Sequence, residues 1–413
     1  MTLTHPDAVA GWLAEIVERD AGSLEDIALA GSGAWSWREG AIRHATNRFF
    51  NVVGLAWQED ARPFIEQREI GTLGLIARPG GGAGLDFLMH AKAEPGNVGL
   101  VQLAPSCQAT ASNADRVHGG AATPFFSPFA GGGGTFLSDS LQSEQGSRFL
   151  AKRNRNAVLL APAIGEPGPL HRWVPFDTLR ALLVQDFLVN TDTRSVLCTS
   201  DWPSLAGRIP FPGEDGFSRE LRASFQAPVR RGMWDRVTAA LDDARAAGPE
   251  VRPVALDAMP GWGFDPGRHR ILEKDGLAVR QIRVRSRTRE VTGWDQPIFD
   301  QAEPQVIDLP CGRADGLLLF GYRPRWEPGL LAGAELAPGL EGQEGRLRLE
   351  VRQSDEGGRF YRDIASYRVL DLGVAEQEPG MLWLTLAEVH AMMPRAVFNN
   401  EARSATSLLL SLA

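Results

Sequence analysis

Ionisable and amide side chains gather in three segments of the first half of the chain. Lys92, Glu94 and Asn97 lie at and just after a Pro-Gly turn. Residues 106–120 combine hydroxyl, amide, carboxyl and imidazole groups, and residues 142–156 begin with Gln-Ser-Glu-Gln-Gly and end in a basic run. Carboxylates and imidazoles transfer protons, and amides and cations hold polar or anionic groups. These segments are therefore the candidates for chemistry, although their residue types alone do not define a reaction.

Each segment also has a plain structural explanation. Glu-Pro-Gly is a common turn, and the imidazole of His118, which precedes Gly-Gly, can serve simply to hydrogen-bond a loop. A basic run such as Lys-Arg-Asn-Arg at residues 152–155 is often a solvated surface. The three segments together, in this order, are far more specific than any one of them.

Parts of these segments recur in the second half of the chain. Residues 92–96, Lys-Ala-Glu-Pro-Gly, return as Arg-Trp-Glu-Pro-Gly, and Gln-Leu-Ala-Pro returns as Glu-Leu-Ala-Pro. The corresponding blocks are 92–96 with 325–329, 102–105 with 335–338, 142–149 with 353–360, and 190–195 with 399–404. Four blocks in one order predict duplication of a unit of roughly 200 residues. The first copy alone holds an added polar segment between Pro105 and Gln142.

Composition limits the class of protein. The 413 residues suffice for two or three domains, and 43% hydrophobic with 23% charged residues is typical of a soluble globular chain. A formal net charge of −8 argues against a general nucleic-acid or membrane-surface binder. The three cysteines are far apart and form no Cys-x-x-Cys pair, which predicts neither a disulfide framework nor a zinc site. No signal pattern and no apolar run of the ~20 residues that a span needs is evident, so we expect a cytoplasmic protein.

Periodicity predicts an α+β fold in which each copy is mostly strand with a late helix. A hairpin is expected around the Glu94 turn, and residues 111–134 are expected to be a long loop. Helices are predicted at 6–19, 176–184 (with Asp177 as a cap), 234–247 and 385–393, and strands at 157–160, 282–289, 316–320, 347–351 and 367–372. The expected domains are 1–200, carrying the chemistry, and 231–413, a diverged scaffold or second nucleotide site, joined by a linker at 201–230.

The linked motifs resemble those of NDP-hexose 2,3-dehydratases, over essentially the whole chain. The motifs are residues 92–97, 108–113 followed by His118-Gly119, 141–146, 152–156 and 192–195. The resemblance implies a tandem pair of Nudix-like units and a homodimer, and we expect no cofactor and no metal. It implies a nucleoside-diphosphate 4-keto-6-deoxyhexose as substrate, with thymidine diphosphate as the expected carrier. The implied reaction is loss of the C2 hydroxyl, which gives a 3,4-diketo-2,6-dideoxy sugar nucleotide.

That reaction needs a base for the C3 proton, a donor for the enolate oxygen and an acid for the departing hydroxyl. We expect His118 to act as acid or base, with Glu94 as its partner or as the alternative base. Lys92 could polarise the ketone, and Glu144 is the other carboxylate of the shared blocks. Order in the sequence gives no distances, so these roles stay open here.

Substrate contacts are expected from the same blocks. Cations for the diphosphate are Lys152, Arg153, Arg155 and Arg194. Amide and hydroxyl groups for the sugar or the base are Asn97, Gln108, Thr110, Ser112, Asn113, Gln142, Ser143, Gln145 and Asn154. An aromatic face under the nucleobase could come from Phe125 or Phe126.

The chain also departs from the family pattern. Ala114 stands where an aromatic residue is usual, which puts the grip on base or sugar in doubt and leaves open a non-catalytic sugar-nucleotide-binding protein. A divergent nucleotide pyrophosphohydrolase is a third hypothesis. It is disfavoured because the acidic Nudix box is missing from the sequence.

Overall fold

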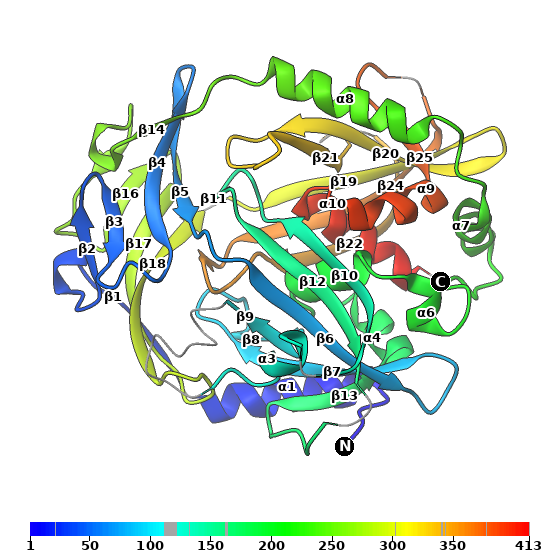
Figure 1. Cartoon of the computed structure of the whole chain (residues 1–413), viewed down its shortest axis with the longest axis horizontal. Coiled ribbons are helices and arrows are strands. Elements are labelled where there is room, and N and C mark those ends of the chain that lie inside the picture. The colour runs from blue at the N-terminus through cyan, green and yellow to red at the C-terminus, as the bar shows by residue number, and fades with distance from the viewer. Residues whose placement is uncertain are drawn as a thin grey trace.

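The computed structural model describes residues 1–20, 22–110, 122–131, 133–161, 164–301, 303–339, 342, 344–376 and 378–412. Within these residues the chain is α+β, with four β-sheets and helices placed between and around them (Figure 1). The expected fold class is confirmed at this level. No described helix is long and apolar enough to cross a membrane.

The first sheet carries most of the predicted site. Its order is β10-β12-β6-β7-β13, with β8 paired to β7 and β9 paired to β6. The predicted hairpin is confirmed, because β7 and β8 pair antiparallel with Lys92 opposite Gln102. The strands are β6 (Gly71–Pro79), β7 (Leu85–Ala93), β8 (Val101–Ala104), β9 (Cys107–Ala109), β10 (Thr135–Ser143), β12 (Arg153–Leu160) and β13 (His171–Pro175).

The second sheet repeats this arrangement without a counterpart of β9. Its order is β22-β24-β19-β20-β25, with β21 paired to β20. Arg325 of β20 lies opposite Glu335 of β21, as Lys92 lies opposite Gln102 in the first sheet. The strands are β19 (Gln305–Ala314), β20 (Leu317–Trp326), β21 (Ala334–Pro338), β22 (Arg346–Ser354), β24 (Ile364–Val374) and β25 (Leu382–Thr385).

Two short polar helices, α5 (Thr191–Cys198) and α10 (Asn400–Ser407), lie between these sheets and contact each other. Each begins at an asparagine cap: Asn190 accepts from the amide of Thr193, and Asn399 accepts from the amide of Ala402. The two sheets and both helices share one continuous hydrophobic core. Sequence periodicity missed both helices, because they are only eight residues long and rich in Ser, Thr and Asn.

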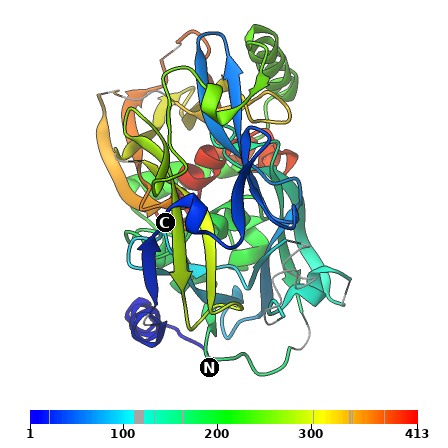
Figure 2. The same cartoon turned by 90° about the vertical axis from the view of Figure 1, so that its left-hand side faces the viewer.

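The other two sheets pack face to face beside this core, and Figure 2 turns them toward the viewer. Each includes a strand from the other half of the chain: β1 pairs with β17, and β14 pairs with β4. One sheet contains β1 (Ser23–Asp26), β15 (Gly263–Phe264), β16 (Arg270–Lys274), β17 (Leu277–Arg285), β18 (Gly293–Gln301) and β23 (Phe360–Tyr361). The other contains β2 (Trp35–Arg38), β3 (Ala41–His44), β4 (Asn51–Trp57), β5 (Asp60–Glu66), β11 (Phe149–Leu150) and β14 (Arg252–Val254).

The remaining helices cover the outside, with α1 along the bottom of Figure 1 and α8 along the top. They are α1 (Pro6–Asp20), α3 (Phe126–Phe129), α4 (Phe176–Leu182), α6 (Trp202–Ala206), α7 (Gly216–Gln226), α8 (Met233–Ala247) and α9 (Leu386–Met392). Short 3-10 turns occupy Leu29–Gly31, Leu256–Ala258, Met393–Arg395 and Leu408–Ser411.

Local detail differs from expectation in several places, and the strand expected at 282–289 ends at Arg285. Asp177 does not cap α4, since Pro175 holds that position and Asp177 instead pairs with Arg208 at 2.8 Å. The segment 201–230, expected as a linker, carries α6 and α7 and buries Trp202 in the shared core. Part of the expected loop forms α3.

The two halves are joined by a reciprocal contact of their Glu-Pro-Gly turns. The amide of Gly96 donates to Gly357 O at 2.8 Å, and the amide of Gly329 donates to Gly146 O at 2.7 Å. A Cβ atom would lie 1.6 Å from Phe360 O at Gly96, and 2.0 Å from Phe149 O at Gly329. Both turns therefore require glycine, because the facing backbone leaves no space for a side chain.

Replacing Gly96 by alanine tests the close approach of this turn to the facing backbone. Gly96→Ala should lower the free energy of unfolding by about 2–4 kcal/mol, because backbone has to move to admit the methyl group. Gly11→Ala in α1, where nothing lies within 4 Å, should raise it by about 0.5–1 kcal/mol. Urea unfolding measures both, and equal midpoints for Gly96→Ala and the wild type would contradict the interlocked turns.

Candidate active site

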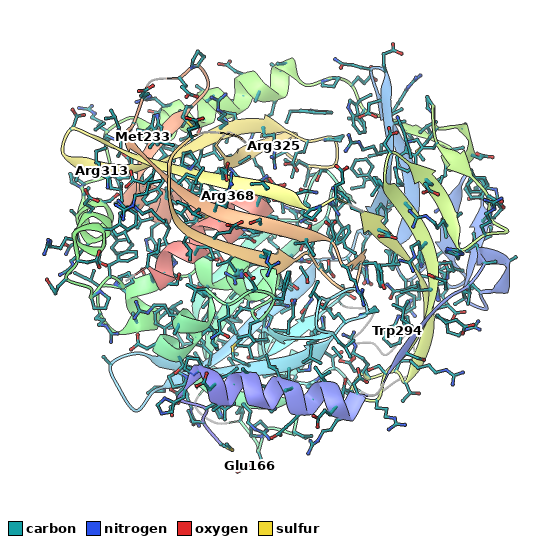
Figure 3. All side chains as sticks on the ribbon, turned by 180° about the vertical axis from the view of Figure 1, so that it is seen from behind. Glu166, Met233, Trp294, Arg313, Arg325 and Arg368 are labelled. Atoms are coloured by element: carbon teal, nitrogen blue, oxygen red, sulfur yellow. The ribbon has the colours of Figure 1, made fainter. Side chains whose placement is uncertain are left out.

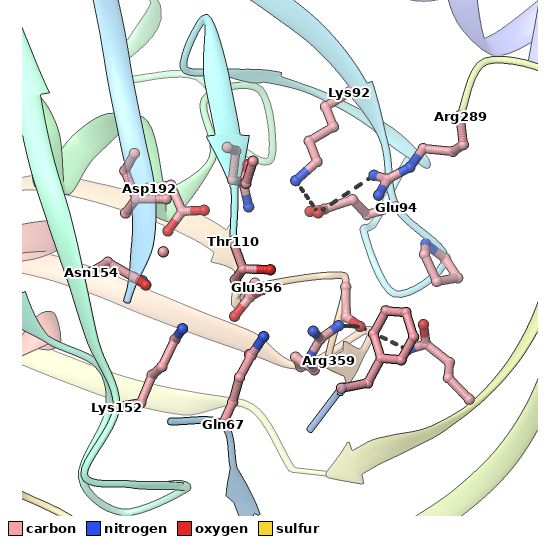
Figure 4. A pocket seen from close by; sticks show the side chains of 18 of the residues that line it. Gln67, Lys92, Glu94, Thr110, Lys152, Asn154, Asp192, Arg289, Glu356 and Arg359 are labelled. Carbon is pink, nitrogen blue, oxygen red and sulfur yellow. Dashed lines mark hydrogen bonds and ion pairs between the residues drawn. The ribbon is translucent and has the colours of Figure 1, made fainter. Parts of the chain in front are cut away.

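A polar cavity of about 130 Å³ opens where the first sheet meets the hairpin β17–β18 and the loop after β22 (Figure 4). The first half contributes Phe49, Gln67, Gly71, Leu73, Lys92, Glu94, Pro95, Gln108, Ala109, Thr110, Lys152, Asn154 and Asp192. The second half contributes Arg289, Trp294, Gln296, Glu356, Gly358 and Arg359. Both halves of the chain therefore build this site.

Lys92 and Glu94 form one wall of the cavity, at the end of β7 and in the following turn. The Lys92 ammonium lies 2.8 Å from Glu94 Oε1, and both side chains are buried. Arg289 Nη1 lies 3.9 Å from the same oxygen and donates to Ala93 O (Figure 4). The carboxylate is thus held at the cavity wall by two cations, one of them from the second half.

Lys152 and Asn154 form the opposite wall, at the start of β12. Lys152 Nζ donates to Glu69 O, and the Asn154 amide donates to Glu144 Oε1. Burial and the neighbouring carboxylate of Glu356 raise the pKa of Glu144 to about 7. Burial lowers the pKa of Lys152 below its ordinary value. Several ionisable groups are therefore held together in a poorly solvated space, an arrangement that is typical of catalytic sites.

Six residues that sequence reasoning did not assign to the site line the cavity with ionisable or aromatic side chains. They are Phe49, Asp192, Arg289, Trp294, Glu356 and Arg359. Asp192 and Arg359 belong to repeated blocks, so the internal repeat was the sequence signal that could have assigned them to the site. Trp294 and Arg289 come from the second half with no local pattern to mark them, and the Trp294 indole donates to Gln296 Oε1 at 2.7 Å.

Three of the four predicted diphosphate cations lie elsewhere. Arg194 is fully buried, and its guanidinium donates to Val189 O and Leu183 O inside the core. Arg155 pairs with Asp139 at 2.6 Å. Arg153 and Arg155 alternate with Asn154 along β12 and so face away from the cavity side of the strand. Of the basic residues predicted here, Lys92 and Lys152 line the cavity.

Four of the amide and hydroxyl residues that were predicted to contact the substrate form hydrogen bonds within the protein around the cavity. Gln142 donates to Met393 O at 3.3 Å, and Ser143 donates to Glu335 Oε2 at 2.6 Å. Gln145 bonds to the carboxyl group of Asp355, and the Asn97 amide donates to Leu100 O within its own turn. By contrast Gln108, Thr110 and Asn154 do line the cavity.

Other predictions concern the added segment. His118, Ser112, Asn113 and Ala114 lie outside the described residues. Phe125 packs edge-on against His171 at 4.8 Å, and with Phe126 it belongs to a small hydrophobic cluster on the first sheet. Neither ring lines the cavity in the described part of the chain.

Two histidines of the described residues lie close to Lys92. His90 of β7 and His171 of β13 stack with ring centroids 4.4 Å apart. Burial lowers the pKa of His171 to about 4 and that of His90 well below its ordinary value. Both imidazoles are therefore neutral at pH 7. Among the residues described, no group of His, Cys, Asp and Glu has the geometry of a metal site.

A second cavity of about 490 Å³ lies in the equivalent position of the second half. Figure 3 labels Arg325, which lies toward the α8 side, and Trp294, which lies toward the α1 side near the first cavity. Arg325 lines the second cavity and pairs with both Glu327, at 2.9 Å, and Glu401. Its charge is therefore neutralised by the protein itself.

Sequence comparison identifies the family of this chain. The profile of the NDP-hexose 2,3-dehydratase family matches residues 7–199, 235–345 and 339–409. The chain belongs to that family, and it is a sugar-nucleotide 2,3-dehydratase.

The similarity to three relatives extends over most of the chain. The chain is 31% identical to a dTDP-4-dehydro-6-deoxy-α-D-glucopyranose 2,3-dehydratase of Saccharopolyspora spinosa, over 97% of this chain and 90% of that protein. Proteins of the same name are 29% identical in Amycolatopsis orientalis (96% of this chain, 88% of the relative) and 34% identical in Streptomyces violaceoruber (80% and 79%).

The buried Glu335 beneath Ser143 gives a pH prediction. Burial raises the pKa of its carboxyl group from 4.5 to about 7, so the folded state binds more protons than the unfolded state between these values. The free energy of unfolding should therefore fall as pH rises from 4.5 to 7. Glu335→Gln should remove up to roughly 3 kcal/mol of this dependence.

Urea unfolding at pH 5, 6, 7 and 8 measures the effect, with the exposed Glu344→Gln as control. Glu144 and Asp355, whose pKa values burial also raises to about 7, should leave part of the slope in place. A slope identical in Glu335→Gln and the wild type would contradict the assignment.

Proposed function

We propose that this enzyme dehydrates dTDP-4-dehydro-6-deoxyglucose across C2 and C3, in the cavity between Lys92–Glu94 and Lys152–Asn154. The names of the three relatives support the substrate class, and the convergence of acids and cations in one buried space supports the site. The product is a 3,4-diketo-2,6-dideoxy sugar nucleotide. The observation that carries the proposal is the Lys92–Glu94 pair at the wall of that cavity.

The chemistry consists of proton transfers and cleavage of the C2–O bond. The C4 ketone acidifies the C3 proton, and loss of that proton with departure of the C2 hydroxyl gives an enol that becomes the diketone. No hydride is gained or lost, so we expect no redox cofactor. Catalysis then depends on a base, an acid and a charge near the C4 oxygen.

Three residues are proposed for these roles. Lys92 carries a buried positive charge that can stabilise the enolate oxygen. Glu94 is ion-paired and can accept the C3 proton, with His118 as partner or as the alternative acid or base. Glu144 supports Asn154 from behind instead of lining the cavity. Its proposed role is therefore to position the Asn154 amide for a sugar hydroxyl.

The nucleotide is proposed to extend from the sugar toward the second half of the chain. The cavity is smaller than a typical ligand site of about 300–1,000 Å³, so the remainder must lie in adjoining space. An adjacent cavity of about 410 Å³ shares Glu94, Pro95 and Trp294 with it. Arg289 and Arg359 can hold the diphosphate, and Trp294 can lie against the base.

The origin of the two halves, the assembly of the chain and its location in the cell also belong to this proposal. We propose that the chain contains two duplicated Nudix-like units. Support comes from the matching strand orders of the two central sheets and from the matching asparagine caps of α5 and α10. The second unit is proposed mainly to scaffold, since Arg325 is neutralised by its own carboxylates. A homodimer rests on the family resemblance, and a cytoplasmic location on the three separate free cysteines.

Turnover tests the function directly. The purified chain should consume dTDP-4-dehydro-6-deoxyglucose without NAD(P)H or added metal, and o-phenylenediamine should trap the vicinal diketone as a quinoxaline. Glu94→Gln and His118→Ala should each lower kcat by roughly 100-fold or more. Glu327→Gln, the counterpart in the second cavity, should retain turnover.

Tight binding of the sugar nucleotide by folded wild type without turnover would favour a non-catalytic binding protein. Magnesium-dependent release of thymidine monophosphate would favour a pyrophosphohydrolase. Either result would contradict the proposed dehydration.

Trp294 tests the placement of the nucleobase. Trp294→Ala should raise KM roughly 10- to 100-fold with little change in kcat, because loss of stacking on a base costs about 1–3 kcal/mol. Trp234→Ala on α8, where the indole contacts Arg395, is the matched control and should leave KM unchanged. An unchanged KM for Trp294→Ala would place the base elsewhere.

A further inference from the structure

Asp192 is a buried acid of the cavity that the mechanism above does not use. It is the second residue of α5 and is only 5% exposed. No described residue donates a hydrogen bond to its carboxyl group or forms an ion pair with it. In Figure 4 the group faces the same space as Lys152 and Thr110. A buried carboxyl group without a partner costs folding free energy, so its presence at the cavity calls for a function.

The second half of the chain provides an internal comparison. Glu401 holds the equivalent place in α10, two residues after the asparagine cap, and the guanidinium of Arg325 pairs with it. In the first half Lys92 stands in place of Arg325 and pairs with Glu94 instead. Within the described residues, Asp192 thus faces the cavity without an ion-paired cation.

Further carboxylates surround Asp192. Glu356 and Glu144 approach it from the loops after β22 and β10. The charges of Lys92 and Glu94 also act on the Asp192 carboxyl group, and Asp192 in turn acts on the guanidinium of Arg403. Burial and the charges of Glu356 and Glu144 raise the pKa of Asp192 well above its ordinary value. The protonated form of the side chain is therefore favoured at pH values where an exposed aspartate is ionised.

We propose that Asp192 is the general acid that protonates the departing C2 hydroxyl. The inference rests on the proposed function and deepens it. The base removes the proton from C3, and the electrons of that C–H bond form the C2–C3 double bond. The C2–O bond breaks as the Asp192 carboxyl proton passes to its oxygen, and water leaves. Asp192 remains as a carboxylate and regains its proton from solvent before the next turnover.

The geometry gives acid and base separate positions. Lys92 and Glu94 lie on the β7 side of the cavity, and Asp192 lies on the α5 side, next to Asn154 (Figure 4). A hexose between them presents C3 and C2, which are adjacent carbons, to two different groups. This division leaves Glu94 for the C3 proton and removes the need for one residue to perform both transfers.

A leaving-group comparison tests the proposal. Fluoride is a far weaker base than hydroxide and departs without full protonation, so a 2-deoxy-2-fluoro analogue of the 4-keto substrate bypasses the acid. Asp192→Asn should lower turnover of the hydroxyl substrate about 100-fold or more, whereas fluoride release from the analogue should fall less than about 5-fold. Equal losses with both substrates would overturn the assignment, as would full activity of Asp192→Asn.

Controls separate this assignment from the proposed function. Glu401→Gln, at the equivalent place of the second cavity, should keep wild-type turnover with both substrates. If Asp192→Asn does not fold, Asp192→Glu replaces it and should impair the hydroxyl substrate more than the fluoro analogue. A wild type that releases neither water nor fluoride overturns the dehydratase proposal itself, and the Asp192 inference with it.

Discussion

The reciprocal insertion of the two Glu-Pro-Gly turns fixes how the halves of this chain meet. Gly96 bonds the loop that carries Glu356 and Arg359, and Gly329 bonds the loop after β10. Each turn approaches the facing carbonyl oxygen too closely for any residue but glycine. Because the cavity is lined by side chains from both partners of this contact, its geometry depends on the docking of the halves and not on either half alone.

Many ionisable side chains are buried together beside this contact. Glu94, Lys92, Lys152, Glu144 and Asp192 are each less than a tenth exposed, and all lie on the first half. Burying ions costs several kcal/mol each unless they are paired or neutralised. Pairing neutralises Lys92 with Glu94, whereas the raised pKa values of Glu144 and Asp192 favour their uncharged forms. Stability in the rest of the fold has to offset this cost.

The features that could be predicted from the sequence are those set by the local pattern of apolar and turn residues. The hairpin that presents Lys92 and Glu94 follows from two apolar runs around a Pro-Gly turn, and the structure confirms it. The basic run at 152–155 was treated as one unit, although strand alternation sends Asn154 and Arg155 to opposite faces. A strand assignment extended back to residue 153 would have separated them.

Other features depend on contacts between distant parts of the chain. Arg194 could not be recognised as a core residue, because α5 itself was not predicted and nothing local showed that its carbonyl partners would be buried. Trp294 and Arg289 reach the cavity across the interface between halves, and no spacing in the sequence carries that information. The repeated block at 353–360 was the one available clue that the second half could take part.

The exchange of β1 and β14 between the two outer sheets restricts how this protein can be divided. A half-length chain that ended near residue 200 would expose the edge of β4 that β14 covers, and it would lack the carbonyl group that receives Gly96. Such a fragment could satisfy both needs only by pairing with another polypeptide, so any ancestor or engineered version of that length would have to assemble before it could act.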